Sequence, residues 1–432
     1  MAEIRPIRPW RYNKELSNSI DEFLSPLFDV VSEKQRAKLY QNPLNSIHLS
    51  VPKGDRPADT AHQTFRKWKA DGTVVQDELP AIYVYYQYFS LPGSSKTYIR
   101  KGFIANIRVY EWHEKVILRH ENTIPHSVSD RKALVALTEL NVSPTHGLYT
   151  DENYELEGHM DEAISHPIYE TEDYQGVRDV LGVIHDAAVI KKFVGLMQEK
   201  QIILADGHHR YEGSLLHMKE MRASNSEHTG QEGYNYHLMY FTNTEADDLR
   251  VLPTHRLVSG LENFSEEELI DKLGNDFHIK PVENLADINE IILGKKWAFG
   301  LILEDSAVKI RLKPEKIEEL KWDFPQHIKE IDLTVLHYFF FEKILGIPGR
   351  EQRELKNVTF ERNFTECVAR VVKNEANFAI ITKEVPIETI KQVCYSGYTM
   401  PQKSTYFYPK VICGYLFSSI SEEDFDLRMQ FN

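Results

Sequence analysis

The chain has 432 residues, of which 42% are hydrophobic and 27% charged, values typical of a soluble globular protein with two to three domains. Its formal net charge is −14, and an acidic surface repels phosphate backbones, so we expect no nucleic-acid partner. Three cysteines without a CxxC pair argue against a disulfide scaffold, and the lack of a long apolar run argues against a membrane protein, so we expect a cytoplasmic location.

The first part of the chain predicts a mixed helix and strand region, 1–115. Residues 33–40 and 57–70 have helical patterns, and Ser32 is a plausible cap for the first. Residues 81–90 and 98–112 are rich in aromatic and β-branched side chains and predict strands, with a bulge at Gly102.

The middle of the chain, 116–258, alternates helices and strands. Asp186 precedes an amphipathic helix that runs to about residue 200, and residues 202–205 predict a short buried strand. A polar turn, 206–210, then leads into a helix over 211–221. The polar stretch 222–235 predicts a mobile surface loop before a strand at 236–242.

A boundary near Gly260 opens the C-terminal α/β region, 259–432. Ser265 caps a new helix, 297–303 and 307–312 predict a hairpin, and 332–345 predicts a buried helix. The overall expectation is a mixed α/β fold, with an α+β region and an α/β region packed on a central core.

The densest polar cluster follows the buried strand at 202–205. Gly207 permits a sharp turn, and the helix after it offers backbone N–H groups that attract anions. Arg210 can donate to a phosphate, and His208 and His209 add polar ring nitrogens. We interpret the turn as a phosphate-binding site, in which Asp206 positions the acceptor or Mg²⁺; a charged turn with local hydrogen bonds is the alternative.

Three further segments are candidates for the same chemistry. His120 and Glu121 follow a strand-like stretch, and Glu121 is a candidate general base or else a solvated surface carboxylate. Residues 403–405 supply a lysine and two hydroxyls, but the upstream glycine pattern of a P-loop is absent. Residues 254–256 are interpreted as a structural strand end beside the site.

Several of these motifs, in order, resemble the family known as domain of unknown function 1015. The resemblance covers nearly the whole chain. It is carried by Ile4–Pro6 (IRP), His120–Thr123 (HENT), Ala205–Glu212 (ADGHHRYE), Leu252–Arg256 (LPTHR) and Met400–Lys410 (MPQKSTYFYPK).

The turn at 206–210 is also similar to the nucleotide-binding turns of sulfiredoxins, ParB-type partition proteins and free serine kinases. His208 stands where sulfiredoxins have their cysteine, so the resemblance does not extend to sulfiredoxin chemistry. Asp206 is closer to the kinase branch, and no helix-turn-helix is evident that would favour the DNA-partition branch. The resemblance implies a ParB/sulfiredoxin-like core from about residue 116 to 258.

The resulting hypothesis is nucleotide-dependent phosphoryl transfer to a small hydroxylated metabolite such as free serine, with ATP or ADP and Mg²⁺. The phosphates are assigned to residues 207–210, catalysis to Asp206, Glu121 and His208, and a metal contact to Asp206. Substrate binding is assigned to His120, Lys403, Ser404 and Thr405, with Lys403 expected in the pocket of Arg210. A non-catalytic nucleotide-binding regulator and a metal-dependent hydrolase using Asp206, His208, His209, His120 and His255 are the alternatives, and the oligomeric state stays open.

Overall fold

The computed structural model describes residues 2–91, 94–173, 175–349, 352, 357–401 and 403–425. Its contacts divide the chain into two compact units. Unit 1 comprises Met1–Arg119, Thr123–Leu249 and Pro409–Asn432, and unit 2 comprises His120–Asn122 and Arg250–Tyr408. Strands from 1–115 and from 116–258 share one sheet of unit 1. The three-part division from the sequence stays a prediction.

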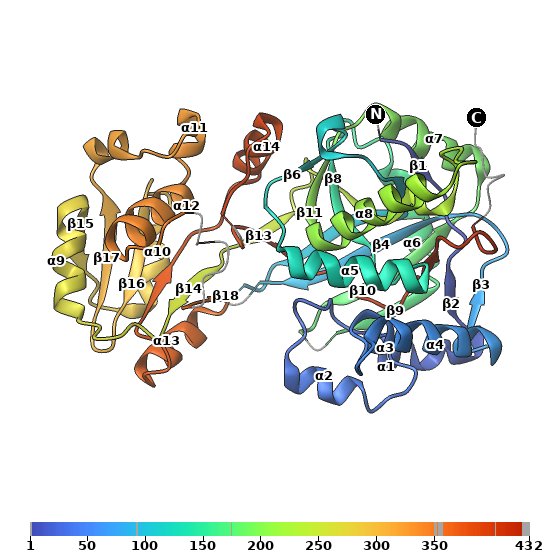
Figure 1. Ribbon diagram of the computed structural model, residues 1–432, viewed down its shortest axis with the longest axis horizontal. Coiled ribbons are helices and arrows are strands. Elements are labelled where there is room, and N and C mark those ends of the chain that lie inside the picture. The colour runs from blue at the N-terminus through green and yellow to red at the C-terminus, as the bar shows by residue number, and fades with distance from the viewer. Residues whose placement is uncertain are drawn as a thin grey trace. The chain divides into compact units, whose positions relative to one another are not determined.

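Unit 1 is built on a nine-stranded mixed sheet with the order β6-β11-β8-β12-β5-β4-β10-β9, to which β1 adds beside β5 (Figure 1). The β11–β6 and β12–β8 pairs are parallel, and the other pairs are antiparallel. The strands are β1 (Ile4–Arg5), β4 (Ile82–Ser90), β5 (Thr97–Arg108), β6 (Ile117–Arg119), β8 (Thr145–Tyr149), β9 (Tyr169–Glu172), β10 (Arg178–Ile184), β11 (Ile202–Asp206) and β12 (Tyr236–Asn243).

Helices cover this sheet, and two short ribbons complete the unit. The ribbons pair β2 (Trp10–Tyr12) with β3 (Val74–Gln76), and β7 (Leu140–Asn141) with β21 (Ser418–Ser419). The helices are α1 (Ile20–Phe23), α2 (Glu33–Leu39), α3 (Ile47–Ser50), α4 (Pro57–Ala70), α5 (Pro125–Thr138), α6 (Glu157–Ile164), α7 (Ala187–Gln198) and α8 (His208–Ser224).

The predicted helices and strands of unit 1 are largely confirmed. Helix α4 has the bounds expected, and Asp186 caps α7 by accepting the Val189 N–H at 2.9 Å. The bulge at Gly102 is wrong, because this residue pairs in register with both Tyr85 and Thr242. A Cβ there would lie 2.3 Å from the Phe241 carbonyl oxygen, so the glycine permits close approach of two strands.

The prediction of a mobile loop over 222–235 is wrong at both ends. Helix α8 continues to Ser224, and Gly233–Asn235 form a 3-10 turn. Glu232 accepts the N–H groups of Thr229 (2.6 Å) and Gly230 (3.0 Å) and the Asn235 amide (2.9 Å). Burial alone would raise the pKa of Glu232, but the hydrogen bonds from Thr229 and Gly230 lower it to about 2.

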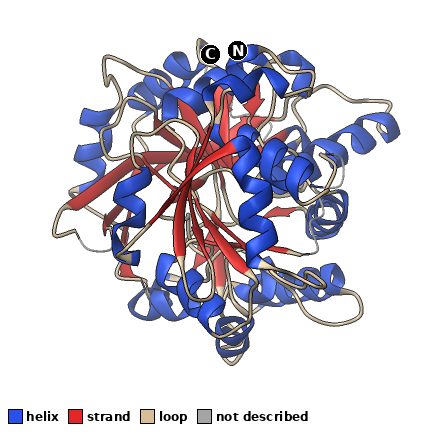
Figure 2. Cartoon of the chain, turned by 90° about the vertical axis from the view of Figure 1, so that its left-hand side faces the viewer, coloured by secondary structure: helices blue, strands red, loops and turns tan. Residues whose placement is uncertain are grey.

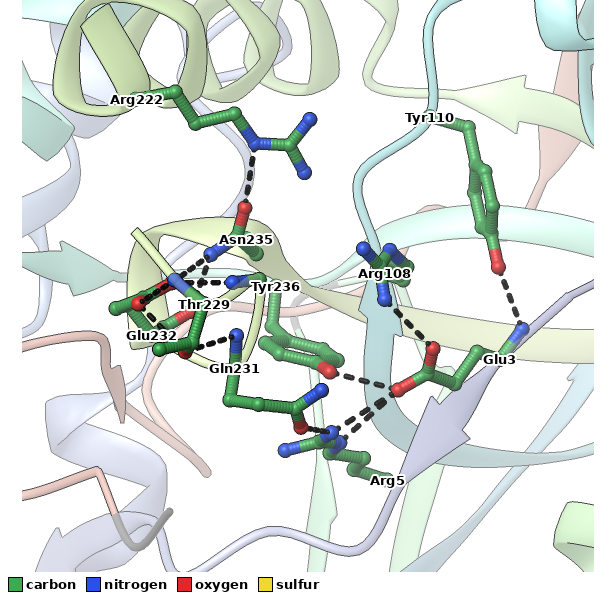
Figure 3. A network of polar contacts seen from close by, with 11 residues as sticks. Glu3, Arg5, Arg108, Tyr110, Arg222, Thr229, Gln231, Glu232, Asn235 and Tyr236 are labelled. Carbon is green, nitrogen blue, oxygen red and sulfur yellow. Dashed lines mark hydrogen bonds and ion pairs between the residues drawn. The ribbon is translucent and has the colours of Figure 1, made fainter. Parts of the chain in front are cut away.

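A second set of contacts connects this segment to the N-terminal strand (Figure 3). Glu3 accepts hydrogen bonds from Tyr236 (2.7 Å) and Arg108 (3.1 Å), and Arg5 donates to Gln231. Polar composition predicted a loop, but Gln231 has a partner on β1, Arg5, which lies 226 residues away in the sequence.

Unit 2 is built on a six-stranded antiparallel sheet with the order β15-β17-β16-β19-β14-β18, whose strands are red in Figure 2. The strands are β14 (His255–Val258), β15 (Phe277–Pro281), β16 (Ala298–Ile302), β17 (Ala307–Leu312), β18 (Val358–Glu361) and β19 (Phe378–Ile381), with a separate ribbon of β13 (Arg250–Leu252) and β20 (Tyr406–Tyr408). The helices are α9 (Glu266–Asp276), α10 (Ile288–Ile292), α11 (Gln326–Lys329), α12 (Asp332–Val335), α13 (Phe364–Val372) and α14 (Ile387–Ser396).

The predicted hairpin of unit 2 is confirmed as β16 and β17, and Ser265 caps α9. The predicted buried helix over 332–345 is present, but most of it is not an α-helix. It is α-helical only over Asp332–Val335 and continues as a π-helix over Leu336–Ile344. The fold class is therefore mixed α/β, with one large mixed sheet and one antiparallel sheet.

The described part of the chain has no candidate membrane-spanning helix and no disulfide. No helix there has both the length and the hydropathy needed to cross a membrane. Cys367, Cys394 and Cys413 are buried and free, and burial raises the pKa of each thiol.

Candidate functional site

The turn at 206–210 is built by the end of β11 and the start of α8. Asp206 is the last residue of the strand, and Gly207 has a φ of 87°. The helix begins at His208 rather than at Tyr211 as predicted, because the Tyr211 N–H bonds the Gly207 carbonyl at 2.9 Å and closes the first turn. Residues 208–210 therefore lie in the first helical turn, where backbone N–H groups lack intrahelical acceptors.

Two cations share the buried carboxylate of Asp206. Lys410 Nζ contacts Oδ1, and Arg210 Nη2 donates to Oδ2 at 2.9 Å. Burial would raise the pKa of Asp206, but the charges of Lys410 and Arg210 lower it well below its usual range. Asp206 is therefore an anion held between two positive charges.

Arg210 is also held by the chain on the other side of its guanidinium. Its Nη1 donates to the Ser143 hydroxyl at 2.9 Å and to the Pro144 carbonyl at 2.7 Å. The side chain is 9% exposed. Arg210 therefore fixes Asp206 in this structure, and its predicted phosphate contact stays a prediction.

The two histidines of the turn are placed differently. His209 Nε2 accepts the backbone N–H of Ile124 at 3.0 Å, so this nitrogen bears no proton. Nearby, Glu212 accepts a hydrogen bond from Thr123 at 2.5 Å. His208 is buried. The start of α8 therefore fixes the segment that enters α5, and contacts of either histidine with phosphate stay predictions.

A buried polar network in the central strands continues from Lys410. The Lys410 carbonyl accepts from Gln87 at 3.1 Å, and Gln87 also donates to Asp179 at 2.8 Å. Tyr85 donates to the same carboxyl oxygen at 2.5 Å, and Arg100 contacts the Gln87 amide oxygen. Lys410, Arg100 and Asp179 were not predicted as site residues; for Arg100 and Asp179, the available signal was a charged residue inside an apolar strand.

The Asp179 carboxyl is expected to make unfolding depend on pH. Burial raises its pKa to about 7, against the hydrogen bonds of Tyr85 and Gln87. A carboxyl whose pKa is raised in the native state stabilises the fold fully below its unfolded pKa, which is near 4. This contribution to the unfolding free energy is lost as the pH rises to about 7. The unfolding free energy of Asp179→Asn, relative to that of wild type, should therefore rise by about 2–3 kcal/mol between pH 5 and pH 8.

Urea unfolding across this pH range measures the difference. Asp59→Asn, at a partly exposed aspartate on α4, is the control and should run parallel to wild type. A constant difference between Asp179→Asn and wild type would show that the carboxyl titrates at an ordinary pH.

In unit 2, the Glu121 carboxylate lies against the turn at 403–405. Oε1 accepts the N–H groups of Ser404 (2.9 Å) and Thr405 (3.2 Å) and the Thr405 hydroxyl (3.3 Å), and Oε2 accepts the Lys403 N–H at 3.3 Å. Lys403 has a φ of 55°, unusual for a residue with a side chain. Successive N–H groups around a left-handed residue form an anion-binding nest, and here Glu121 is its anion.

The segment around Glu121 is joined to the C-terminal motif on both sides. The Met400 N–H bonds the His120 carbonyl at 2.7 Å, and Asn122 donates to Thr399 at 2.9 Å. His120 is buried, and its Nε2 contacts the Thr405 hydroxyl at 2.7 Å. The structure thus brings together the four residues assigned to substrate binding and Glu121.

The Leu252–Arg256 motif supplies a buried cation to unit 2. Arg256 is fully buried, and burial lowers its pKa to about 10, opposed by the charge of Glu121. Its Nη1 contacts the Thr254 carbonyl. His255 accepts the Thr382 N–H at 3.2 Å, and burial lowers its pKa to about 4. The predicted strand end is confirmed as the start of β14.

Removing the Glu121 carboxylate is expected to destabilise unit 2. Glu121→Ala leaves three N–H groups and a hydroxyl without their acceptor, which costs about 2–4 kcal/mol. Glu121→Gln keeps an oxygen acceptor and should cost about 1 kcal/mol. Urea unfolding measures both losses.

The control for these variants is Glu388→Ala, whose side chain is 70% exposed. It should stay within about 0.5 kcal/mol of wild type. A Glu121→Ala loss as small as that of the control would mean that the nest does not need its anion.

The metal contact assigned to Asp206 is not supported. Among the residues with described positions, no group of three His, Cys, Asp or Glu side chains could hold a metal ion. Asp206 is already neutralised by Lys410 and Arg210, which compete with a metal for its oxygens. A protein-held metal therefore does not fit this site.

The predicted site residues fall into two clusters. Unit 1 contains Asp206, Gly207, His208, His209 and Arg210, and unit 2 contains His120, Glu121 and 403–405. That Lys403 serves the same ligand as Arg210 stays a prediction.

Residues 4–334 match the model of a family described as a protein of unknown function, DUF1015. The chain belongs to this family. No curated protein matches the chain.

Solved structures show a distant likeness. A conserved hypothetical protein from Pyrococcus furiosus has 13% identity and a TM-score of 0.37, covering 75% of this chain and 97% of that one. Free serine kinase in complex with AMP has 12% identity and a TM-score of 0.37, covering 75% and 93%. SbnI from Staphylococcus aureus, with a C-terminal truncation, has 10% identity and a TM-score of 0.36, covering 76% and 92%.

Proposed function

We propose that this DUF1015 protein binds the phosphates of a nucleotide at the start of α8 and transfers a phosphoryl group to a small hydroxylated metabolite. The observation that carries the proposal is the buried Asp206 carboxylate between two cations, beside a glycine in a left-handed conformation and a helix start. The helix N-terminus and the nearby Lys410 ammonium both attract an anion. The proposal includes a ParB/sulfiredoxin-like core over residues 116–258.

The proposal assigns the phosphates to the backbone at Gly207–Arg210 and to Lys410 Nζ, which was missed from the sequence. Lys410 is a flexible single charge, so it can exchange a contact with Asp206 for one with a phosphate oxygen. Arg210 would then keep Asp206 neutralised. Mg²⁺ would enter with ATP or ADP, and no step is assigned to it.

In the proposed reaction, the acceptor hydroxyl oxygen attacks the γ-phosphorus of ATP. The new O–P bond forms as the bond to the β-phosphate oxygen breaks, and ADP leaves with that electron pair. Glu121 is assigned the hydroxyl proton, because its Oε2 accepts only one long hydrogen bond among the described contacts. His120 and 403–405 are assigned to the acceptor, free serine being the first to test.

Calorimetric titration of the full chain with ATP and ADP, with and without Mg²⁺, tests binding, and ADP release with a panel of hydroxylated acceptors tests transfer. Lys410→Met should weaken binding at least tenfold, and Glu121→Gln should lower turnover with binding unchanged. Binding without turnover for any acceptor would favour a nucleotide-binding regulator. No binding at millimolar nucleotide would overturn the proposal.

A further inference from the structure

Unit 2 gathers four cations around the edge strand of its sheet. Strand β15 is the edge strand, and β17 lies beside it (Figure 1). In this pair Lys280 stands opposite Lys309, and Arg311 lies two residues further along β17, so all three side chains leave the same face of the sheet. Lys295, which follows α10, acts electrostatically on Lys309. We call Lys280, Lys295, Lys309 and Arg311 the basic face.

No carboxylate neutralises the basic face. Among the described residues, none of its four cations forms an ion pair. Arg311 Nε donates to the Lys296 carbonyl at 3.2 Å, and Lys295 Nζ donates to the Ile291 carbonyl at 2.6 Å, so both acceptors are neutral. Burial lowers the pKa of Lys309, and the charges of the other three cations lower it further. Like charges that stand opposite each other across two strands destabilise a sheet, so an anion from outside unit 2 would stabilise this face.

Protection of the sheet edge does not account for the basic face. Lysine and proline on an edge strand discourage another strand from pairing with it, and Lys280 and Pro281 on β15 fit that role. Lys309 and Arg311 lie on β17, which is paired on both sides, with β15 and with β16. An inner strand has no free edge to protect. Docking of an anionic surface on this face would offset the repulsion that edge protection leaves unexplained.

The charge of the whole chain limits the size of the partner's acidic area. The formal net charge is −14, so a nucleic acid or an anionic membrane, which extends well beyond four side chains, would meet repulsion from the rest of the chain. An acidic area of a protein that is no larger than the basic face would meet less of it. The chain itself carries such an area.

This acidic area lies in unit 1, at the start of α6. Glu152 and Glu155 precede the helix and are exposed, and Glu157, its first residue, is partly buried. Within the described part of the chain, none of the three forms an ion pair. Burial raises the pKa of Glu157, and two neighbouring aspartates raise it further, although the Lys101 charge opposes them. We call Glu152, Glu155 and Glu157 the acidic face.

We propose that the basic face of one copy of this chain docks on the acidic face of a second copy. The contact relieves the like-charge repulsion within each face. Exposed ion pairs are weak and are screened by salt, so the association is favoured by high protein concentration and low ionic strength. It does not depend on the nucleotide proposal, because neither face includes a residue assigned to nucleotide or acceptor.

Sedimentation velocity of the full chain over a range of concentrations tests the association. At low salt the weight-average mass should rise with concentration. At about 1 M salt, where the screening length is about 3 Å, it should return to the mass of the single chain. A mass that does not change with concentration at low salt would overturn the proposal.

Charge reversal identifies the two surfaces. The double variants Lys280→Glu/Lys309→Glu and Glu152→Lys/Glu155→Lys should each weaken self-association by about tenfold or more. An equimolar mixture of the two should associate again, because the first keeps the acidic face and the second keeps the basic face. Both variants keep a net negative charge, so overall attraction would not explain the restored association. Variants that stay apart when mixed would overturn the proposal.

The control is Lys321→Glu/Lys373→Glu, which makes the same charge change at two exposed lysines of unit 2 outside the basic face. It should keep self-association within about threefold of wild type. Thermal unfolding of each variant shows whether it is folded. A control that loses association as fully as Lys280→Glu/Lys309→Glu would mean that net charge alone sets the association, and the docking surface would be wrong.

Discussion

Gly207→Ala is expected to lower the unfolding free energy by about 2–5 kcal/mol, through strain and overpacking together. Gly207 has a φ of 87°, where an L-residue is strained. A Cβ at this position would also lie 2.6 Å from Thr145 Cγ2 and 2.9 Å from Arg210 Nη2. Arg210 would have to move, and the Asp206 contact would be lost with it, so nucleotide binding should also disappear.

The matched control separates strain from overpacking. Gly72 has a φ of 74°, and a Cβ there would meet no atom within 4 Å. Gly72→Ala should therefore cost only the backbone strain, about 1–2 kcal/mol. Urea unfolding of both variants decides the question, and equal losses would mean that the turn can accommodate a methyl group beside Thr145.

Periodicity and capping were sufficient to predict elements whose signals are local. Helix α4 has Pro57 at its first turn and α7 has Asp186 at its cap, and both lie where the sequence placed them. The start of α8 was missed by three residues, because polar side chains at 208–210 look like a turn. The start of the helix depends on the left-handed conformation of Gly207. A glycine permits this conformation, but its presence in the sequence does not predict it.

The candidate site was predictable in its residues but not in its contacts. Asp206 and Arg210 form an i, i+4 pair that the sequence could have indicated. The second cation on Asp206 could not be found in this way, because Lys410 lies 204 residues away. Glu121 was considered as a base or a surface group, and its contacts with three consecutive N–H groups depend on a turn 282 residues later.

The Asp206 carboxylate is expected to show an asymmetric response when its partners are removed. Asp206→Asn removes the carboxylate that both Lys410 and Arg210 contact, and breaking a buried pair costs about 3–5 kcal/mol. In Lys410→Met, the carboxylate keeps Arg210, so a smaller loss of about 2–3 kcal/mol is expected. The double variant should lose about 2 kcal/mol less than the sum of the two single losses, because each single variant already removes the Asp206–Lys410 contact.

Unfolding of the two single variants and the double variant completes the cycle, and pH gives a second readout. The native pKa of Asp206 is lowered, so its stabilisation is present above the unfolded value near 4 and is lost as the pH falls below it. Asp206→Asn should remove this acid sensitivity.

The exposed Arg178–Glu170 pair, with side chains 46% and 48% exposed, is the control, and Glu170→Gln should cost less than about 1 kcal/mol. Additive losses in the Asp206–Lys410 cycle would mean that the two charges act independently, and Lys410 would then be available to a phosphate at no cost to the fold.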